Sequence, residues 1–163
     1  MAEQVFVSLS PQDGVPRSFI AAVRTPQSHP VRLVTNDRSN RLWLRVMVSL
    51  LVVTSVPADS AIASNGYTFQ LYRGDGRTRF DEIVAYHWTP NDPTAKRTWP
   101  HLHIGSAFID PAARREPLAL HKTHFLTGSI TAPGFVRMAI EEFGAQPVVA
   151  DWQEQLVEDG VLS

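Results

Sequence analysis

The sequence predicts an α+β fold in which C-terminal helices pack on one face of a curved antiparallel sheet. Strand-like alternation of apolar residues dominates the first two thirds of the chain, and helical periodicity is confined to its C-terminal part. At 163 residues without a long linker, we expect a single domain, residues 1–163. The 44% apolar and 19% charged fractions are typical of a folded soluble domain.

The strongest strand pattern covers residues 41–54, where apolar side chains at every second position share one face. The same alternation covers 67–71, and an Asp-Gly signal within 73–78 predicts a turn that returns the chain antiparallel along 79–88. A short strand is expected at 101–105. The apolar face of the first strand is formed by Leu42, Leu44, Val46, Val48, Leu50 and Val52.

The N-terminal region gives shorter signals. We expect strands at 4–9 and 31–35, and a loop over 56–66. A short helix is predicted over 16–23, because Pro16 suits the first turn of a helix.

The end of the chain is predicted to be helical. Residues 132–143 carry an apolar stripe at helical spacing, with Thr131 as the expected N-cap and Gly144 as the stop signal. Asp151 and Glu154 have the spacing of a capping box and predict a second short helix. The stripe consists of Phe135, Val136, Ala139, Ile140 and Phe143.

Composition excludes several classes of function. The chain has no cysteine, which excludes disulfides and thiolate nucleophiles and restricts metal ligands to His, Asp and Glu. Its longest apolar run, 46–53, is far shorter than the roughly 20 residues of a membrane helix, so we expect a cytoplasmic protein without a membrane partner. Net charge is −1, but residues 1–122 hold 14 basic and 10 acidic side chains, which favours an anionic partner.

Histidines are concentrated in one stretch of the sequence. Residues 82–125 contain five of the six, and imidazole can act as acid, base or metal ligand near neutral pH. His101 and His103 share a face of their predicted strand, because residues two apart in a strand point the same way. The candidate catalytic residues are His87, His101, His103, His121 and His124. Basic and aromatic side chains flank them, and the candidate substrate-binding residues are Lys96, Arg97, Trp99 and Lys122.

Three interpretations of this cluster stay open on the residues alone. The first is a divalent metal held by His101, His103 and either His121 or His124, as in a metal-dependent hydrolase or a cupin-like enzyme; a cupin would want an acidic residue sooner after H-x-H than Asp110. The second is metal-independent cleavage of RNA, with one histidine as base and another as acid. The third is a non-catalytic binding module whose histidines are structural.

The run GYTFQLYRGDGRTRFDEIVAYHW…WPHLHIG, residues 66–105, resembles the TumE-like small toxins of bacterial toxin–antitoxin modules. Its most specific part is Pro100-His101-Leu102-His103, although this chain has Thr89-Pro90-Asn91-Asp92-Pro93 where that family has paired histidines. The resemblance implies a toxin-like ribonuclease that acts on RNA and is partnered by an antitoxin protein. We therefore expect a metal-independent ribonuclease, with His101 and His103 as the catalytic pair and no cofactor.

Overall fold

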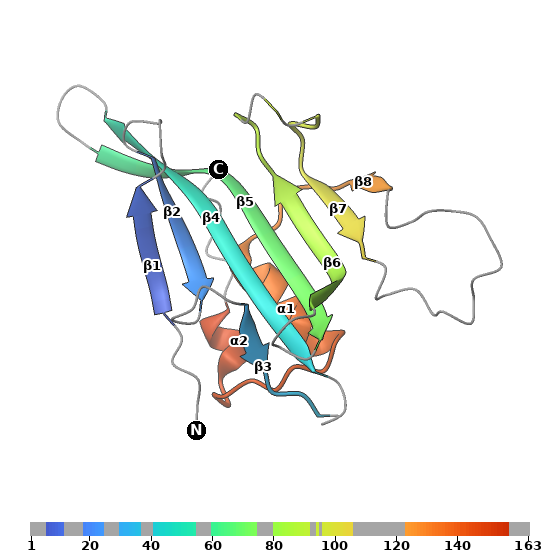
Figure 1. The fold of residues 1–163 in the computed structure, drawn as a ribbon. Helices are drawn as coiled ribbons and strands as arrows, with labels where there is room; N and C mark the ends of the chain where they lie inside the picture. The colour runs from blue at the N-terminus through green and yellow to red at the C-terminus, as the bar shows by residue number, and fades with distance from the viewer. Residues whose placement is uncertain are drawn as a thin grey trace.

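An antiparallel sheet followed by two helices forms the part of the chain that the structure describes (Figure 1). The computed structural model describes residues 6–11, 18–24, 30–36, 41–54, 60–74, 80–91, 94, 96–105 and 123–156. Its eight strands follow the order β1-β2-β4-β5-β6-β7-β8, and β3 pairs with β4 beside this path. The predicted α+β class, a curved antiparallel sheet with C-terminal helices on one face, is confirmed.

The elements have the following bounds. The strands are β1 Phe6–Pro11, β2 Ser18–Arg24, β3 Val31–Leu33, β4 Leu42–Thr54, β5 Ser60–Gly74, β6 Phe80–Trp88, β7 His101–Ile104 and β8 His124–Leu126. The helices are α1 Ala132–Glu141 and α2 Trp152–Gln155. None of the helices in the described ranges has the length and apolar character needed to cross a membrane.

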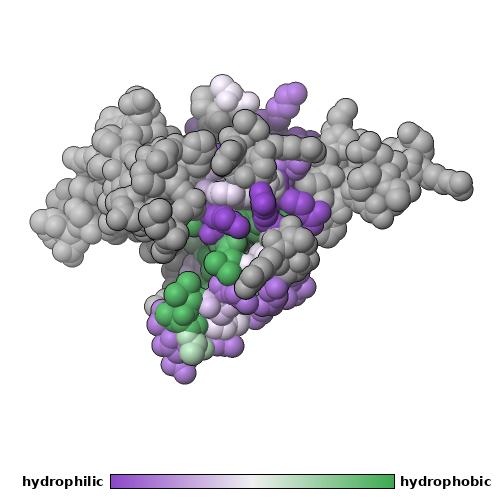
Figure 2. All heavy atoms as spheres, turned by 60° about the horizontal axis from the view of Figure 1, so that its bottom comes forward, coloured by the Kyte–Doolittle hydropathy of each residue, from purple (hydrophilic) through white to green (hydrophobic). Residues whose placement is uncertain are grey.

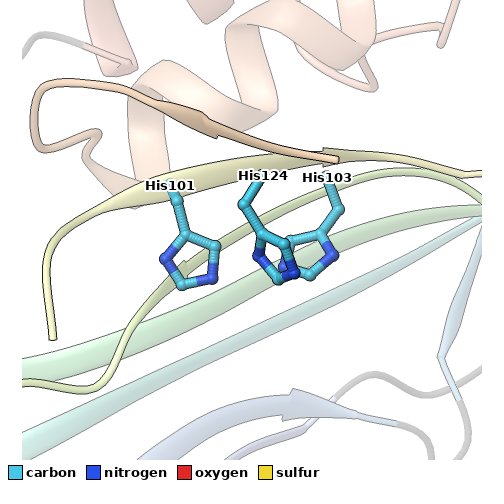
Figure 3. A group of neighbouring side chains, drawn as sticks. All are labelled: His101, His103 and His124. Carbon is cyan, nitrogen blue, oxygen red and sulfur yellow. The ribbon is translucent and has the colours of Figure 1, made fainter. Parts of the chain in front are cut away.

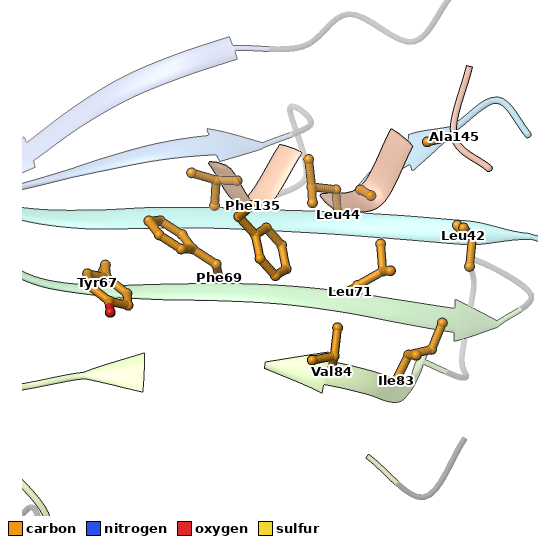
Figure 4. Close-up of a cluster of buried hydrophobic side chains, with 11 residues drawn as sticks. Leu42, Leu44, Tyr67, Phe69, Leu71, Ile83, Val84, Phe135 and Ala145 are labelled. Carbon is orange, nitrogen blue, oxygen red and sulfur yellow. The ribbon is translucent and has the colours of Figure 1, made fainter. Parts of the chain in front are cut away.

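The core lies between the central strands and α1. Leu44 pairs with Leu71, and Val46 with Phe69, so the apolar faces of β4 and β5 are continuous. Phe135 of α1 is fully buried against this face, with its ring 5.6 Å from that of Phe69 (Figure 4). The predicted alternation of β4 and the predicted stripe of α1 therefore form one core.

Both ends of α1 follow their sequence signals. The Thr131 side chain accepts a hydrogen bond from the Gly134 backbone at 3.1 Å, and Gly144 adopts a positive φ of 70°. Beyond the helix, Ala145 forms a bridge with Thr35, which ties this segment to the chain following β3. Asp151 is the N-cap residue of α2, so the predicted second short helix is confirmed. The Asp151 side chain makes no capping hydrogen bond, so the capping box predicted at its start is wrong.

Two local predictions are wrong. Residues 18–24 form β2 instead of a helix, because their backbone pairs with β4 on one side and with β1 on the other. Residues 60–66, predicted as loop, extend β5, and the register shifts beside Gly66. Gly66 has a φ of 141°, and a Cβ atom there would lie 2.6 Å from the Trp88 carbonyl oxygen, so glycine is required at this irregularity.

Hydrophilic and hydrophobic side chains both occur on the surface that faces the bottom of Figure 1. Figure 2 shows hydrophilic residues over most of the coloured part of this face, with a compact hydrophobic group at its lower edge. Val34, Val148 and Val149 are exposed apolar residues of the described chain.

Candidate metal centre

Three adjacent strands place four histidines on one face of the sheet. In the register of β6, β7 and β8, His87 lies opposite His101, and His103 lies opposite His124. Paired residues of antiparallel strands point to the same face, and alternate residues of one strand share it. Leu102 lies between the two β7 histidines and packs against the core, so the histidines occupy the face opposite α1.

The imidazole rings are close to one another. Ring centroids are 5.0 Å apart for His101 and His103, 5.0 Å for His101 and His124, and 4.1 Å for His103 and His124. Each of these three offers a ring nitrogen, and these nitrogens all lie within 4.8 Å of one another. Figure 3 shows the three rings extending to the same side of β7 and β8. They are therefore close enough to hold a metal ion.

His87 is the fourth neighbour. Its ring centroid is 4.8 Å from that of His103 and 5.8 Å from that of His101. It does not belong to the group whose nitrogens all lie within 4.8 Å of one another. The centre thus has three convergent imidazoles and a fourth beside them.

A backbone carbonyl fixes the tautomer of His101. Its Nδ1 lies 2.8 Å from the Trp99 carbonyl oxygen. Because a carbonyl can only accept, Nδ1 carries the proton and donates, which leaves the lone pair on Nε2. Metal-binding histidines commonly donate their second ring N–H in this way, and the hydrogen bond holds the ring in place. His101 is also buried, which further restricts its ring.

His124 has a ring nitrogen without a partner. Its Nδ1 atom is buried and has no hydrogen bond within the described chain. An unsatisfied buried polar atom typically costs about 1–3 kcal/mol. A ligand that accepts the lone pair of this nitrogen would remove that cost.

Burial and neighbouring positive charge lower the pKa values of His87, His103 and His124. Burial, followed by the nearby His101 and His124, lowers the pKa of His87 to about 4. The pKa of His103 is also lowered to about 4, first by burial and then by its histidine neighbours and Arg97. Burial and then Arg97 lower the pKa of His124. At pH 7 neutral rings are favoured, and neutral rings can donate lone pairs to a metal.

Arg97 and Trp99 form the rim beside the histidines. The Arg97 guanidinium carbon lies 5.9 Å from the centroid of the Trp99 ring, and the Trp99 ring meets His101 edge-on at 5.2 Å. Trp99 is 36% exposed. Lys96 is exposed in the same loop and, within the described ranges, makes no hydrogen bond or ring contact with the histidines.

The metal hypothesis left the third ligand open between two histidines. The structure brings His124 to His101 and His103, because β8 pairs with β7. His121, Lys122 and Asp110 lie outside the described residues. No described carboxylate is among the neighbours that shift the pKa values of these histidines. The register of the short strand β8 against β7 decides which histidines converge.

The chain matches no protein-family model, no curated protein and no solved structure. The resemblance to TumE-like toxins therefore stays a prediction.

Proposed function

We propose that this protein is a metal-dependent hydrolase whose single divalent ion is bound by His101, His103 and His124. The observation that carries this proposal is the convergence of three ring nitrogens within 4.8 Å of one another. Nitrogens around a tetrahedral zinc ion lie roughly 3.3 Å apart, so each pair closes by at most roughly 1.5 Å when the ion binds. Side-chain rotation on the two paired strands β7 and β8 is sufficient for that change.

The donor set favours a transition metal. Imidazole nitrogens suit zinc, copper, iron and nickel, whereas magnesium and calcium prefer oxygen ligands. Three protein ligands leave a coordination position for water, which is the arrangement of catalytic zinc sites and not of closed structural ones. Zinc is our first expectation.

The electrostatics of the site support hydrolysis. Neutral imidazoles do not cancel the charge of the ion, and such an ion lowers the pKa of its bound water to about 7. The chain's own contribution is to hold the ligands: the Trp99 carbonyl orients His101, and the β7–β8 pairing orients His103 and His124. An ion held by these residues would supply a water-derived nucleophile near neutral pH.

A metal-independent ribonuclease is the second candidate, and Arg97 is the observation that favours it. Arg97 lies close enough to lower the pKa of both His103 and His124, and a cation there would stabilise a phosphodiester transition state. This mechanism requires one protonated histidine as general acid. A pKa of about 4 leaves His87 and His103 almost entirely neutral at pH 7, so we place this candidate second. An antitoxin protein partner belongs to the same candidate.

Metal content after reconstitution distinguishes the metal-dependent hydrolase from the metal-independent ribonuclease. Protein loaded with zinc and then dialysed should retain about one equivalent by elemental analysis, and His101→Ala, His103→Ala and His124→Ala should each lose most of it. His87→Ala is the matched control, and it should keep its zinc because His87 lies outside the convergent group. Wild-type protein that retains no zinc, and that cleaves RNA in the presence of EDTA, would replace this proposal with the second candidate.

A further inference from the structure

The charge of the centre selects its substrate, provided that the proposed metal function holds. Imidazole ligands bind a metal in their uncharged form, so a divalent ion held by three of them would keep its charge of about +2. Arg97, whose guanidinium lies over the Trp99 ring that contacts His101, would add one positive charge. The convergent group consists of three histidines and contains no carboxylate of the described chain. A site of about +3 attracts an anion strongly.

Arg97 is linked to the proposed ligand His101 through the Trp99 ring. Arg97, Trp99, His101 and His103 are spaced two residues apart. Ring contacts link the first three, since Arg97 lies over Trp99 and the edge of Trp99 meets His101. The stacked guanidinium loses less freedom when it binds an anion than a free side chain would.

We infer that the centre binds the terminal phosphoryl group of a phosphate monoester, with one oxygen on the metal ion and two on the Arg97 guanidinium. The guanidinium fork is matched to two oxygens of one phosphate. A monoester has three non-bridging oxygens, which is enough for one on the metal ion and two on the Arg97 guanidinium. A diester has two such oxygens and a carboxylate has two in total, so each leaves one arm of the fork without an oxygen.

The reaction that this geometry implies is monoester hydrolysis. A bond forms between the water oxygen and phosphorus, and the bond from phosphorus to the ester oxygen breaks. One proton of the water ends on the released alcohol and the other stays on the phosphate. Trp99 acts as a positioning residue, because it contacts Arg97 and His101 and holds both in place.

Cobalt(II) bound in place of zinc tests this inference, because its visible spectrum reports both the ion and an incoming anion. Cobalt-loaded protein is titrated with inorganic phosphate, dimethyl phosphate and acetate. The variants are Arg97→Gln, Arg97→Lys and the matched control Arg32→Gln, which removes an exposed charge on β3. Wild-type protein should bind phosphate more tightly than dimethyl phosphate or acetate.

Arg97→Gln should weaken phosphate binding roughly ten- to a hundredfold, the usual effect of losing a charge-assisted hydrogen bond. It should leave cobalt affinity unchanged or raise it, because a repelling cation is removed. The phosphate affinity of Arg97→Lys should lie between those of wild type and Arg97→Gln, because lysine keeps the charge but lacks the two-pronged guanidinium. Arg32→Gln should change neither affinity.

Three results would overturn the inference: dimethyl phosphate binding as tightly as phosphate, Arg97→Gln binding phosphate like wild type, or Arg97→Gln losing cobalt as well. A wild-type protein that does not take up cobalt would reject the metal centre itself, and with it this inference. That failure is recognisable, because it appears before any phosphate is added.

Discussion

Alternate residues of the same strands build the two faces of the sheet. One face packs against α1 in the core, and the other carries the four histidines. On β6, Tyr86 points toward α1, and its ring meets Phe135 edge-on at 5.9 Å, while the next residue, His87, joins the histidines on the other face. On β7, Leu102 packs with the core between His101 and His103. Because alternation in a strand separates the side chains so completely, stability and chemistry should respond to different substitutions.

The histidine face itself has two parts. Toward β4, its polar groups satisfy one another: Arg45 donates to Gln70 at 3.5 Å, and Gln70 donates to Glu82 at 2.9 Å. At the β7–β8 end, His124 keeps a buried nitrogen without a partner in the described chain. His124 Nδ1 and Thr127 Oγ1 are the two buried side-chain atoms of the described chain without a partner, and the histidine nitrogen lies where we propose that a ligand binds.

The largest expected effect is on the helix-covered face. Phe135→Ala removes a fully buried ring that contacts Phe69 and Tyr86, and we expect it to lower the free energy of unfolding by about 3–5 kcal/mol. Denaturant unfolding measures this. The fraction that stays folded should still bind one zinc ion. Phe125→Ala, at a position that is 36% exposed, is the control and should cost much less.

Zinc should stabilise the protein through the opposite face. A zinc concentration of 100 times the dissociation constant adds roughly 2.7 kcal/mol, or roughly 5–10 °C in melting temperature for a chain of this size. His124→Ala should abolish this increase and leave the metal-free melting temperature almost unchanged, because the alanine also removes an unsatisfied nitrogen. An equal loss of stability with and without zinc would show that His124 is structural.

Gly105 is the position where both faces should respond together. Its backbone N–H donates a hydrogen bond to the Ile83 carbonyl oxygen at 2.7 Å. A Cβ atom at this position would lie 1.8 Å from the Glu82 carbonyl oxygen. Gly105→Ala must push β7 away from β6, so we expect a loss of about 1–3 kcal/mol and weaker zinc binding in the same variant. Gly128→Ala is the control, because a Cβ atom meets nothing within 4 Å there. Intact zinc affinity in Gly105→Ala would show that the centre tolerates strand displacement.

Sequence predicts the two faces unequally well. The alternation of β4 and the stripe of α1 repeat over many residues, so several side chains enforce each prediction, and both are confirmed. The predicted helix at 16–23 depended on Pro16 alone, and pairing with β1 and β4 outweighs that local signal. The sequence also named all the histidines near the centre. Which of them converge depends on the register of β8 against β7, and a long-range pairing leaves no local pattern.

The smallest expected effect tests whether the helix-covered face and the histidine face are independent. Thr131 caps α1 through its side-chain oxygen, and α1 follows β8 in the chain after only a short connection. Thr131→Ala should lower the free energy of unfolding by about 1 kcal/mol, which is roughly 2–4 °C in melting temperature, while Thr131→Ser should keep the cap. Neither variant should alter zinc affinity, because the ligands are held by β7 and β8 and not by the helix. If Thr131→Ala weakened zinc binding and Thr131→Ser did not, α1 would help to hold His124 in place, and the two faces would be coupled through the connection between β8 and α1.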